Sequence, residues 1–154
     1  GASVVVGRPF EVGREPALEA RSVPSLGLRL EVPEGITGPT ATASPEVTFG
    51  DPMVDGLMIG VLSERWAQPM DDASLAAELE SVATELAASS PERTTLGGHP
   101  ALLAQSSTEG VAIRRAFVFT PVRWVRLEVA YRDSLQSAYG TLVTRMAATL
   151  QEEP

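Results

Sequence analysis

The last third of the chain constrains the fold most, because three strand-like segments joined by short turns are followed by one amphipathic segment. The expected strands are residues 101–107, 111–119 and 123–131. Connections this short join neighbouring antiparallel strands, so we predict a meander. The preceding turn, Gly97-Gly98-His99-Pro100, has the glycine and proline content of a tight turn.

Two segments have the apolar periodicity of helices. In residues 72–88 one face carries Leu75, Leu79, Val82 and Leu86, with Asp71 or Asp72 as the N-cap. In residues 134–150 one face carries Leu135, Tyr139, Leu142, Val143, Met146 and Leu150. Asp133 and Gln136 are spaced as a capping box for this second helix.

The first half of the chain indicates further strands. Residues 26–32 alternate between apolar and polar positions, and residues 46–49 and 57–62 have the composition of short strands, whereas residues 36–45 are expected to form a loop. We assign residues 1–24 to an N-terminal arm or linker, in which Val4–Val6 is either a short strand or part of the arm, and residues 25–152 to a single domain. The predicted class is α+β: an antiparallel sheet, with a C-terminal three-strand meander, covered by two helices.

The register of the last hairpin is predicted from the faces of its strands. A three-residue loop, Thr120–Val122, gathers most of the large apolar residues on one face. That register places Arg114 opposite Glu128, a favourable cross-strand pair. It also directs Arg115 to the apolar face, which the sequence does not explain.

Composition excludes several classes of protein. The 154 residues carry a net charge of −8 with a pI near 4.6, which disfavours nucleic acid and anionic membrane surfaces as partners. The absence of cysteine excludes disulfides and thiolate metal sites. No apolar run approaches the roughly 20 residues of a transmembrane helix. Because the chain starts at Gly1 and not at Met, we expect a processed end or an end set by recombinant expression.

No recognisable catalytic, cofactor or metal motif is present. His99 is the only histidine, and its place in a tight turn favours a structural role. Asp51 and Asp55 flank a turn that lacks the middle ligand of a calcium loop. No glycine-rich phosphate loop occurs. We therefore predict no catalytic residue, no cofactor and no metal.

A partner-binding surface is the remaining hypothesis for a site. Its expected members are Met53, Met58, Trp66, Met70, Arg115 and Trp124. The methionines and Trp66 fall in one short stretch and suit either a groove for apolar peptide segments or simple core filling. The last hairpin adds a cluster of arginines that suits either an acidic partner or local pairing with Glu109 and Glu128; its members are Arg114, Arg115, Arg123 and Arg126.

Two short motifs resemble the PsbP-like superfamily. Residues 26–35 (LGLRLEVPEG) are similar to its entry strand, and residues 96–101 (LGGHPA) to its Gly-x-Pro-Ala turn, which precedes a meander and a final helix. The resemblance covers residues 26–150. Two features depart from it: Ile36 stands where a tryptophan is usual, and metal-binding histidines of the photosystem type are absent. The superfamily includes the photosystem II extrinsic protein, the Ran-binding Mog protein, bacterial lipoproteins and Eag-type chaperones.

The resemblance implies a binding or assembly protein, since most members of the superfamily are not enzymes. The first functional hypothesis is a non-catalytic accessory domain of a bacterial envelope or secreted protein, acting through protein–protein contacts. The alternative is a cytoplasmic Eag-like chaperone that shields apolar segments of a secreted effector. A hydrolase using an Asp or Glu pair is a third hypothesis, disfavoured because no nucleophile–base pair is visible.

Overall fold

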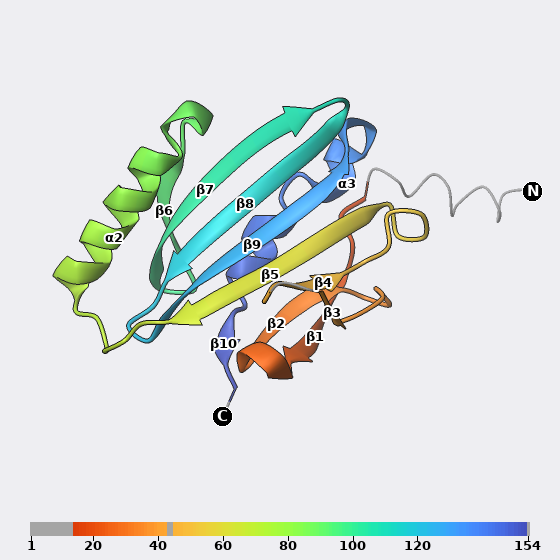
Figure 1. The fold of residues 1–154 in the computed structure, drawn as a ribbon. Coiled ribbons are helices and arrows are strands. Elements are labelled where there is room, and N and C mark those ends of the chain that lie inside the picture. The colour runs from red at the N-terminus through yellow and green to blue at the C-terminus, as the bar shows by residue number, and fades with distance from the viewer. Residues whose placement is uncertain (1–13, 43–44, 154) are drawn as a thin grey trace, which may run out of the picture.

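A seven-stranded antiparallel sheet divides the molecule into two sides (Figure 1). The computed structural model describes residues 14–42 and 45–153, so the predicted Val4–Val6 strand lies outside the described residues. In spatial order the strands are β3 (Thr40–Ala41), β4 (Val47–Phe49), β5 (Leu57–Arg65), β9 (Arg123–Arg132), β8 (Val111–Phe119), β7 (His99–Thr108) and β6 (Glu92–Leu96). The predicted meander is confirmed as β7–β8–β9.

A second, three-stranded sheet contains β1 (Leu18–Val23), β2 (Leu28–Pro33) and β10 (Gln151–Glu152). The alternation that predicts β2 holds, because its apolar positions are buried while Arg29 is exposed. The turn η2 (Pro24–Leu26) joins β1 to β2 and ends at Gly27, which has a φ of +66°. The predicted arm is wrong at residues 18–23, because these residues pair with β2 along their whole length.

The first helix, α2 (Asp72–Glu85), begins as predicted. The Asp71 carboxylate accepts a hydrogen bond from the Ser74 N–H at 2.8 Å, which lowers the pKa of Asp71. The short turn η3 (Ala87–Ser89) follows. The strand β6, which the sequence analysis did not assign, comes next and leads into the turn at Gly97 and Gly98, where both φ angles are positive.

The second predicted helix is interrupted. It consists of the turn η4 (Asp133–Leu135) and two short helices, α3 (Gln136–Tyr139) and α4 (Leu142–Ala147). Gly140 lies at the interruption, and glycine disfavours helix. The capping box is absent, because the Gln136 amide oxygen accepts a hydrogen bond from Tyr131 Oη at 2.5 Å instead.

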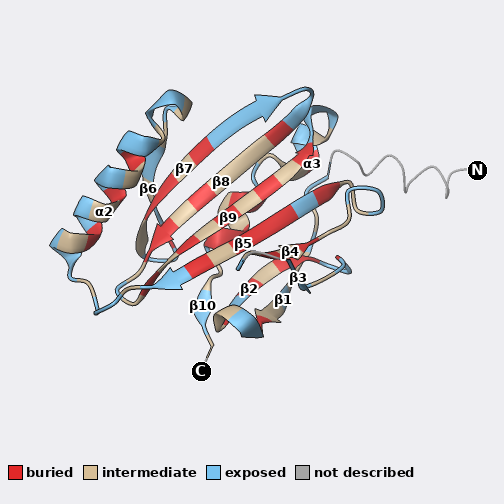
Figure 2. Cartoon of the chain, in the orientation of Figure 1, coloured by how far each residue is buried: buried red, intermediate tan, exposed pale blue. Residues whose placement is uncertain are grey.

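The core lies between the inward face of the large sheet and a layer made of the small sheet and α4 (Figure 2). The longer strands, such as β2, β5 and β9, contribute buried side chains to this core at alternating positions. Its largest fully buried side chains are Phe49, Leu28, Leu30, Ile59, Leu127, Leu142 and Met146. The apolar stripe of the second helix is confirmed despite the interruption: Leu142, Val143 and Met146 are buried, and the other three residues pack against the same core.

The register of the β8–β9 hairpin differs from the prediction by one residue. Arg115 pairs with Glu128, and Phe119 with Trp124. The hairpin closes at Thr120 and Arg123, where the Thr120 N–H donates to the Arg123 carbonyl at 2.9 Å and the Thr120 hydroxyl contacts three main-chain groups of the turn. Arg115 therefore points to the outward face of the sheet, away from the core. The predicted placement of this arginine on the apolar face is wrong.

Arg123 joins the two sheets from a buried position. Its guanidinium donates hydrogen bonds to the Leu26 carbonyl at 2.5 Å and to the Ser63 hydroxyl at 3.3 Å, and its Nη2 donates to Glu152 at 3.0 Å. Its Nε lies 2.7 Å from the same carboxylate, an ion pair without hydrogen-bond geometry. The side chain is 5% exposed, so this contact ties β9 to the turn η2 and to β10.

An ion pair attaches α2 to β6. The Arg93 guanidinium donates two hydrogen bonds to Glu80, at 2.7 and 2.6 Å, and these bonds hold the pKa of Glu80 below its ordinary value of 4.5. Because folding favours the ionised carboxyl, the stabilisation is present above that value and is lost as the pH falls through the folded pKa.

We expect Glu80→Gln to lower the urea midpoint at neutral pH and to leave it unchanged at pH values below the folded pKa. Both side chains are more than half exposed, so the difference is small and shrinks with added salt. Urea unfolding measured across a pH series checks this. A midpoint difference of the same size at acidic pH would contradict it.

Candidate binding face

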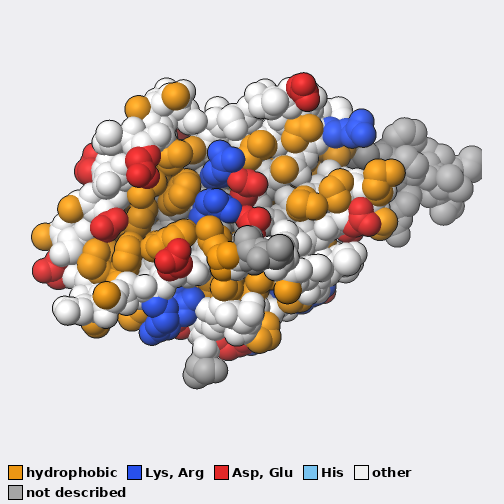
Figure 3. Space-filling view, in the orientation of Figure 1, with side chains coloured by type: hydrophobic (Ala, Val, Ile, Leu, Met, Phe, Trp, Pro, Cys, Tyr) orange, Lys and Arg blue, Asp and Glu red, His pale blue; other side chains and the backbone are white. Residues whose placement is uncertain are grey.

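The outward face of the large sheet is only partly covered. The helix α2 packs over the end of the sheet near β6 and β7, and among residues 14–42 and 45–153 no helix lies over the remaining area across β8, β9 and β5 (Figures 1 and 3). We call this uncovered area the open face. The side chains that alternate onto it from β8, β9 and β5 include Ile113, Arg115, Arg126, Glu128, Ala130, Met58 and Leu62.

A cluster of aromatic and apolar residues borders the open face under α2. Its buried members are Leu75, Leu79, Ala83, Leu102 and Phe119, and its partly buried members are Trp66, Met70, Val82, Phe117 and Trp124. The Trp66 indole N–H donates to the Thr120 carbonyl at 2.7 Å, and the Met70 N–H donates to the Pro121 carbonyl at 2.8 Å. These bonds attach the segment before α2 to the β8–β9 turn, so the cluster is fixed in position.

Four charged side chains occupy the centre of the open face. Arg115 Nε donates to Glu128 Oε1 at 2.6 Å, and Arg126 Nη2 donates to Glu46 Oε2 at 2.5 Å. We call these four residues the charge quartet. Each side chain is between 26% and 30% exposed. Two guanidinium groups therefore face two carboxylates in a neutral arrangement that solvent reaches only in part.

A glycine makes room for the quartet. Gly60 on β5 lies opposite Glu128, and a Cβ atom at Gly60 would stand 2.5 Å from the Glu46 carboxylate. The carboxylate therefore rests directly on the backbone of β5. Figure 3 shows the resulting pattern: basic and acidic side chains meet at the centre of this face, with hydrophobic side chains on both sides.

The structure places the predicted partner-binding residues in three groups. Trp66, Met70 and Trp124 belong to the cluster under α2. Met58, which is 39% exposed, and Arg115 alternate onto the open face with Trp124. Met53 lies in the turn before β5 and is 91% exposed. Their role in binding stays a prediction.

The arginines of the last hairpin lie in different environments, which depend on their positions along β8 and β9. Arg123 is buried, Arg114 points inward, and Arg115 and Arg126 belong to the charge quartet. Sequence reasoning missed Glu46, because its contact with Arg126 joins segments that are far apart in the chain. Gly60, a glycine inside a strand pattern, was a signal of close approach that the sequence did carry.

The other residues considered in the sequence lie in the turn before β5 and at the start of β7. Asp55 accepts a hydrogen bond from the Asp51 N–H at 2.8 Å and Asp51 from the Met53 N–H at 2.9 Å, so both carboxylates stabilise the turn. Burial, and then the charge of Asp55, raises the pKa of Tyr139 above 10.0. His99 begins β7 and lines a cavity of about 180 Å³ beside Arg123.

Two further observations concern the described residues. Within residues 14–42 and 45–153, no group of three or more His, Asp or Glu side chains is placed to hold a metal ion. In the same ranges, every helix falls short of the length and apolar character needed to cross a bilayer.

The architecture defines an α+β class in which a large antiparallel sheet carries one helix on its outer face and a small sheet and short helices on the other. The chain is similar to a crystal structure at 1.50 Å of a Bacteroides thetaiotaomicron protein, with a TM-score of 0.64 and 10% identity over 88% of this chain. The match spans 48% of that protein, so this chain corresponds to about half of its length.

A second similar structure identifies the fold. The solution structure of the cyanobacterial PsbP protein (CyanoP) from Synechocystis matches with a TM-score of 0.59 and 11% identity, over 88% of this chain and 92% of that one. The chain therefore has the PsbP-like fold, as the two sequence motifs predicted. No protein-family model matches the chain, and no curated protein is significantly similar to it in sequence.

Proposed function

We propose that this domain is a non-catalytic accessory module that binds another protein through its open face, in the bacterial envelope or outside the cell. The observation that carries the proposal is the open face itself, where a charge quartet lies between a fixed aromatic cluster and the apolar side chains of Met58, Ile113 and Ala130. Aromatic residues, Met and Arg are enriched in protein interfaces, and all three kinds lie on or beside this face. The envelope or extracellular location rests on the resemblance to a superfamily that includes lipoproteins.

The two carboxylates of the charge quartet support binding over hydrolysis. Glu46 and Glu128 share the open face, but each is held by an arginine at 2.6 Å or less. A general acid or base must reach the proton of its substrate, and a carboxylate oxygen that already accepts a hydrogen bond from a guanidinium is less available for that contact. An orienting role for these residues suits an interface whose partner presents charges of its own.

The test is site-specific photo-crosslinking in cells that express the full protein. A photoreactive residue at Met58 on the open face should give crosslinks to a partner, whereas the same residue at Arg29, exposed on the small sheet, should give none. Met58→Asp should lower affinity for the identified partner by about tenfold, because burying an unpaired carboxylate costs more than 1.4 kcal/mol. Crosslinks from Arg29 alone, or an unchanged affinity of the Met58→Asp variant, would contradict the proposal.

An Eag-like chaperone is the second candidate, and the aromatic cluster under α2 favours it. Trp66, Phe117 and Trp124 are only partly buried and border the open face, so they offer adaptable apolar contact to a helix. A synthetic apolar helical peptide that remains soluble only with this protein, and precipitates with a Trp124→Ser variant, would favour the chaperone over the accessory domain.

A further inference from the structure

The outer edge of β7 is paired along only half of its length. β6 pairs with residues 99–103 of β7, whereas within the part of the chain that the structure describes, residues 104–108 pair with β8 alone, on the other side. The chain turns at Ser90, whose φ is +47°, and β6 begins only at Glu92, so it does not extend along the second half. Figure 1 shows the short β6 beside the long β7, and Figure 2 shows the exposed end of β7.

The free half of this edge presents main-chain groups to solvent. The pair Leu96–His99 closes the β6–β7 hairpin and fixes the alternation along β7. The odd-numbered residues of β7 therefore direct their N–H and C=O groups toward the side of the strand on which β6 lies. The main-chain groups of Gln105 and Ser107 therefore point outward where β6 no longer runs. Residues 105–108 are exposed and contain no proline or charge, which are the devices that usually protect such an edge.

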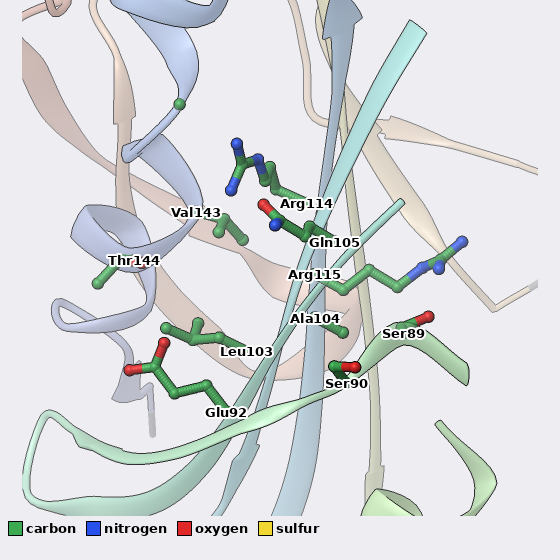
Figure 4. Close-up of a pocket in the computed structure, with 11 residues that line it drawn as sticks. Ser89, Ser90, Glu92, Leu103, Ala104, Gln105, Arg114, Arg115, Val143 and Thr144 are labelled. Carbon is green, nitrogen blue, oxygen red and sulfur yellow. The ribbon is translucent and has the colours of Figure 1, made fainter. Parts of the chain in front are cut away.

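Two cavities lie along this free edge. They measure about 360 and 350 Å³, and Gln105 and Arg114 line both. The first straddles the edge (Figure 4): Val143 and Thr144 of α4 lie on one side of β7, and Ser89 and Ser90 lie on the other. An added strand sends alternate side chains to both faces of a sheet, so a cavity open to both faces suits a strand better than a globular ligand.

The charged side chains beside the free edge of β7 favour some sequences for an added strand over others. Arg114 lies opposite Gln105 on the inward face, and its Nε donates to Tyr131 Oη at 3.3 Å. Among residues 14–42 and 45–153, no carboxylate lies within ion-pair distance of Arg114. Glu92 lines the opposite end of the first cavity and Asp133 lines the second, and each repels an acidic residue close to it, so the part of the first cavity beside Arg114 is the favoured place for a carboxylate. A carboxylate on the added strand is therefore favoured beside Arg114 and disfavoured beside Glu92.

We propose that residues 104–108 of β7 accept an extended, acidic segment of another protein as an additional strand of the large sheet. The main-chain groups of Gln105 and Ser107 supply the pairing, and Arg114 selects a segment with a carboxylate on its inward side. This is strand addition, in which main-chain hydrogen bonds give affinity and side-chain contacts give specificity. The site adjoins the open face, since Arg115 of the charge quartet also lines the first cavity, but the main-chain pairing along β7 does not depend on the quartet.

The probe is a capped peptide, Ser-Thr-Val-Glu-Val-Thr-Ser, with a matched peptide that has Gln in place of Glu. In NMR titrations of the full chain, we expect the Glu peptide to protect the amides of Gln105 and Ser107 from hydrogen exchange. Ser107→Pro should weaken binding by about tenfold, through the lost donor and the ring. Ser107→Ala keeps the N–H and should bind as the unchanged protein does.

Arg114→Gln tests the charge separately. The unchanged protein should bind the Glu peptide several-fold more tightly than the Gln peptide, and Arg114→Gln should remove this preference while keeping amide protection. Equal binding by Ser107→Pro and Ser107→Ala, or no protection of the two amides at saturating peptide, would overturn the proposal. Concentration-dependent broadening of residues 104–108 without peptide would also overturn it, because the occupant would then be a second copy of the chain. Met58→Asp should leave peptide binding unchanged, so this result and that of the open face are independent.

Discussion

Arg123→Leu is expected to destabilise the protein by about 3 kcal/mol, because a buried arginine that joins the two sheets is removed. The substitution leaves the Leu26 carbonyl without the donor that Arg123 supplies, while the Ser63 hydroxyl loses one bond and keeps its bond to the Trp124 carbonyl. An unsatisfied buried group costs on the order of 1–3 kcal/mol. Glu152 is 45% exposed, so its carboxylate is hydrated in the variant and adds little to the loss. Chemical unfolding monitored by tryptophan fluorescence measures the change.

Arg65→Leu is the matched control, since Arg65 contacts the same carboxylate at 3.6 Å but is 64% exposed. An exposed ion pair contributes about 0–1 kcal/mol, so this variant should unfold close to the unchanged protein. In the Arg123→Leu variant, hydrogen exchange should also accelerate in β10. A loss below about 1 kcal/mol for Arg123→Leu, or equal losses for the two variants, would mean that Arg123 does not join the sheets as described.

Phe49→Ala is expected to cost about 4 kcal/mol, the range for a large aromatic removed from a core that cannot collapse. Phe49 is fully buried, its ring lies 5.9 Å from the Arg21 guanidinium carbon, and that guanidinium donates to the carbonyls of Ile36 and Gly38 at 2.6 Å. The loss therefore extends to the loop that Arg21 supports. Calorimetry should show a fall in the unfolding temperature on the order of 10 °C.

Met53→Ala, in the neighbouring turn, serves as the control for Phe49→Ala. Met53 is 91% exposed, so its removal should change the free energy of unfolding by less than about 0.5 kcal/mol. If Phe49→Ala is tolerated as well as Met53→Ala, the packing at the β4 end of the core is looser than the structure indicates.

Local patterns predicted most of the fold. The alternation of Leu28, Leu30 and Val32 identified β2, and the stripe of Leu75 and Leu79 identified α2 with its N-cap at Asp71. β6 was missed because Leu96 is its only buried residue, so no alternation marks it. The interruption at Gly140 was missed because the apolar stripe continues across it and keeps contact with the core.

The hairpin register was wrong for a physical reason. Apolar residues occur on both faces of β8, since Ala116 and Val118 face the core and Phe117 and Phe119 face α2. Matching apolar faces therefore does not select a register when both faces are covered in part. The hydrogen bonds of Thr120 that close the turn decide it, and they depend on tertiary geometry.

The candidate surfaces were predictable only in part. Met58, Arg115 and Trp124 were named from composition and do share one face of the sheet. The contact between Glu46 and Arg126 depends on strand order, which a single sequence does not encode locally. The free edge of β7 depends on where β6 ends, so it emerges only when both strands are placed.

The pairing of β10 with β2 has a consequence for how the chain folds during synthesis. Gln151 and Glu152 pair with Arg29 and Leu28, so the small sheet joins residues from nearly opposite ends of the sequence. The β1–β2 hairpin emerges from the ribosome before the meander, but its third strand and the Glu152 partner of Arg123 emerge after the meander. The meander, whose contacts are local, is therefore formed before the small sheet closes over its inward face.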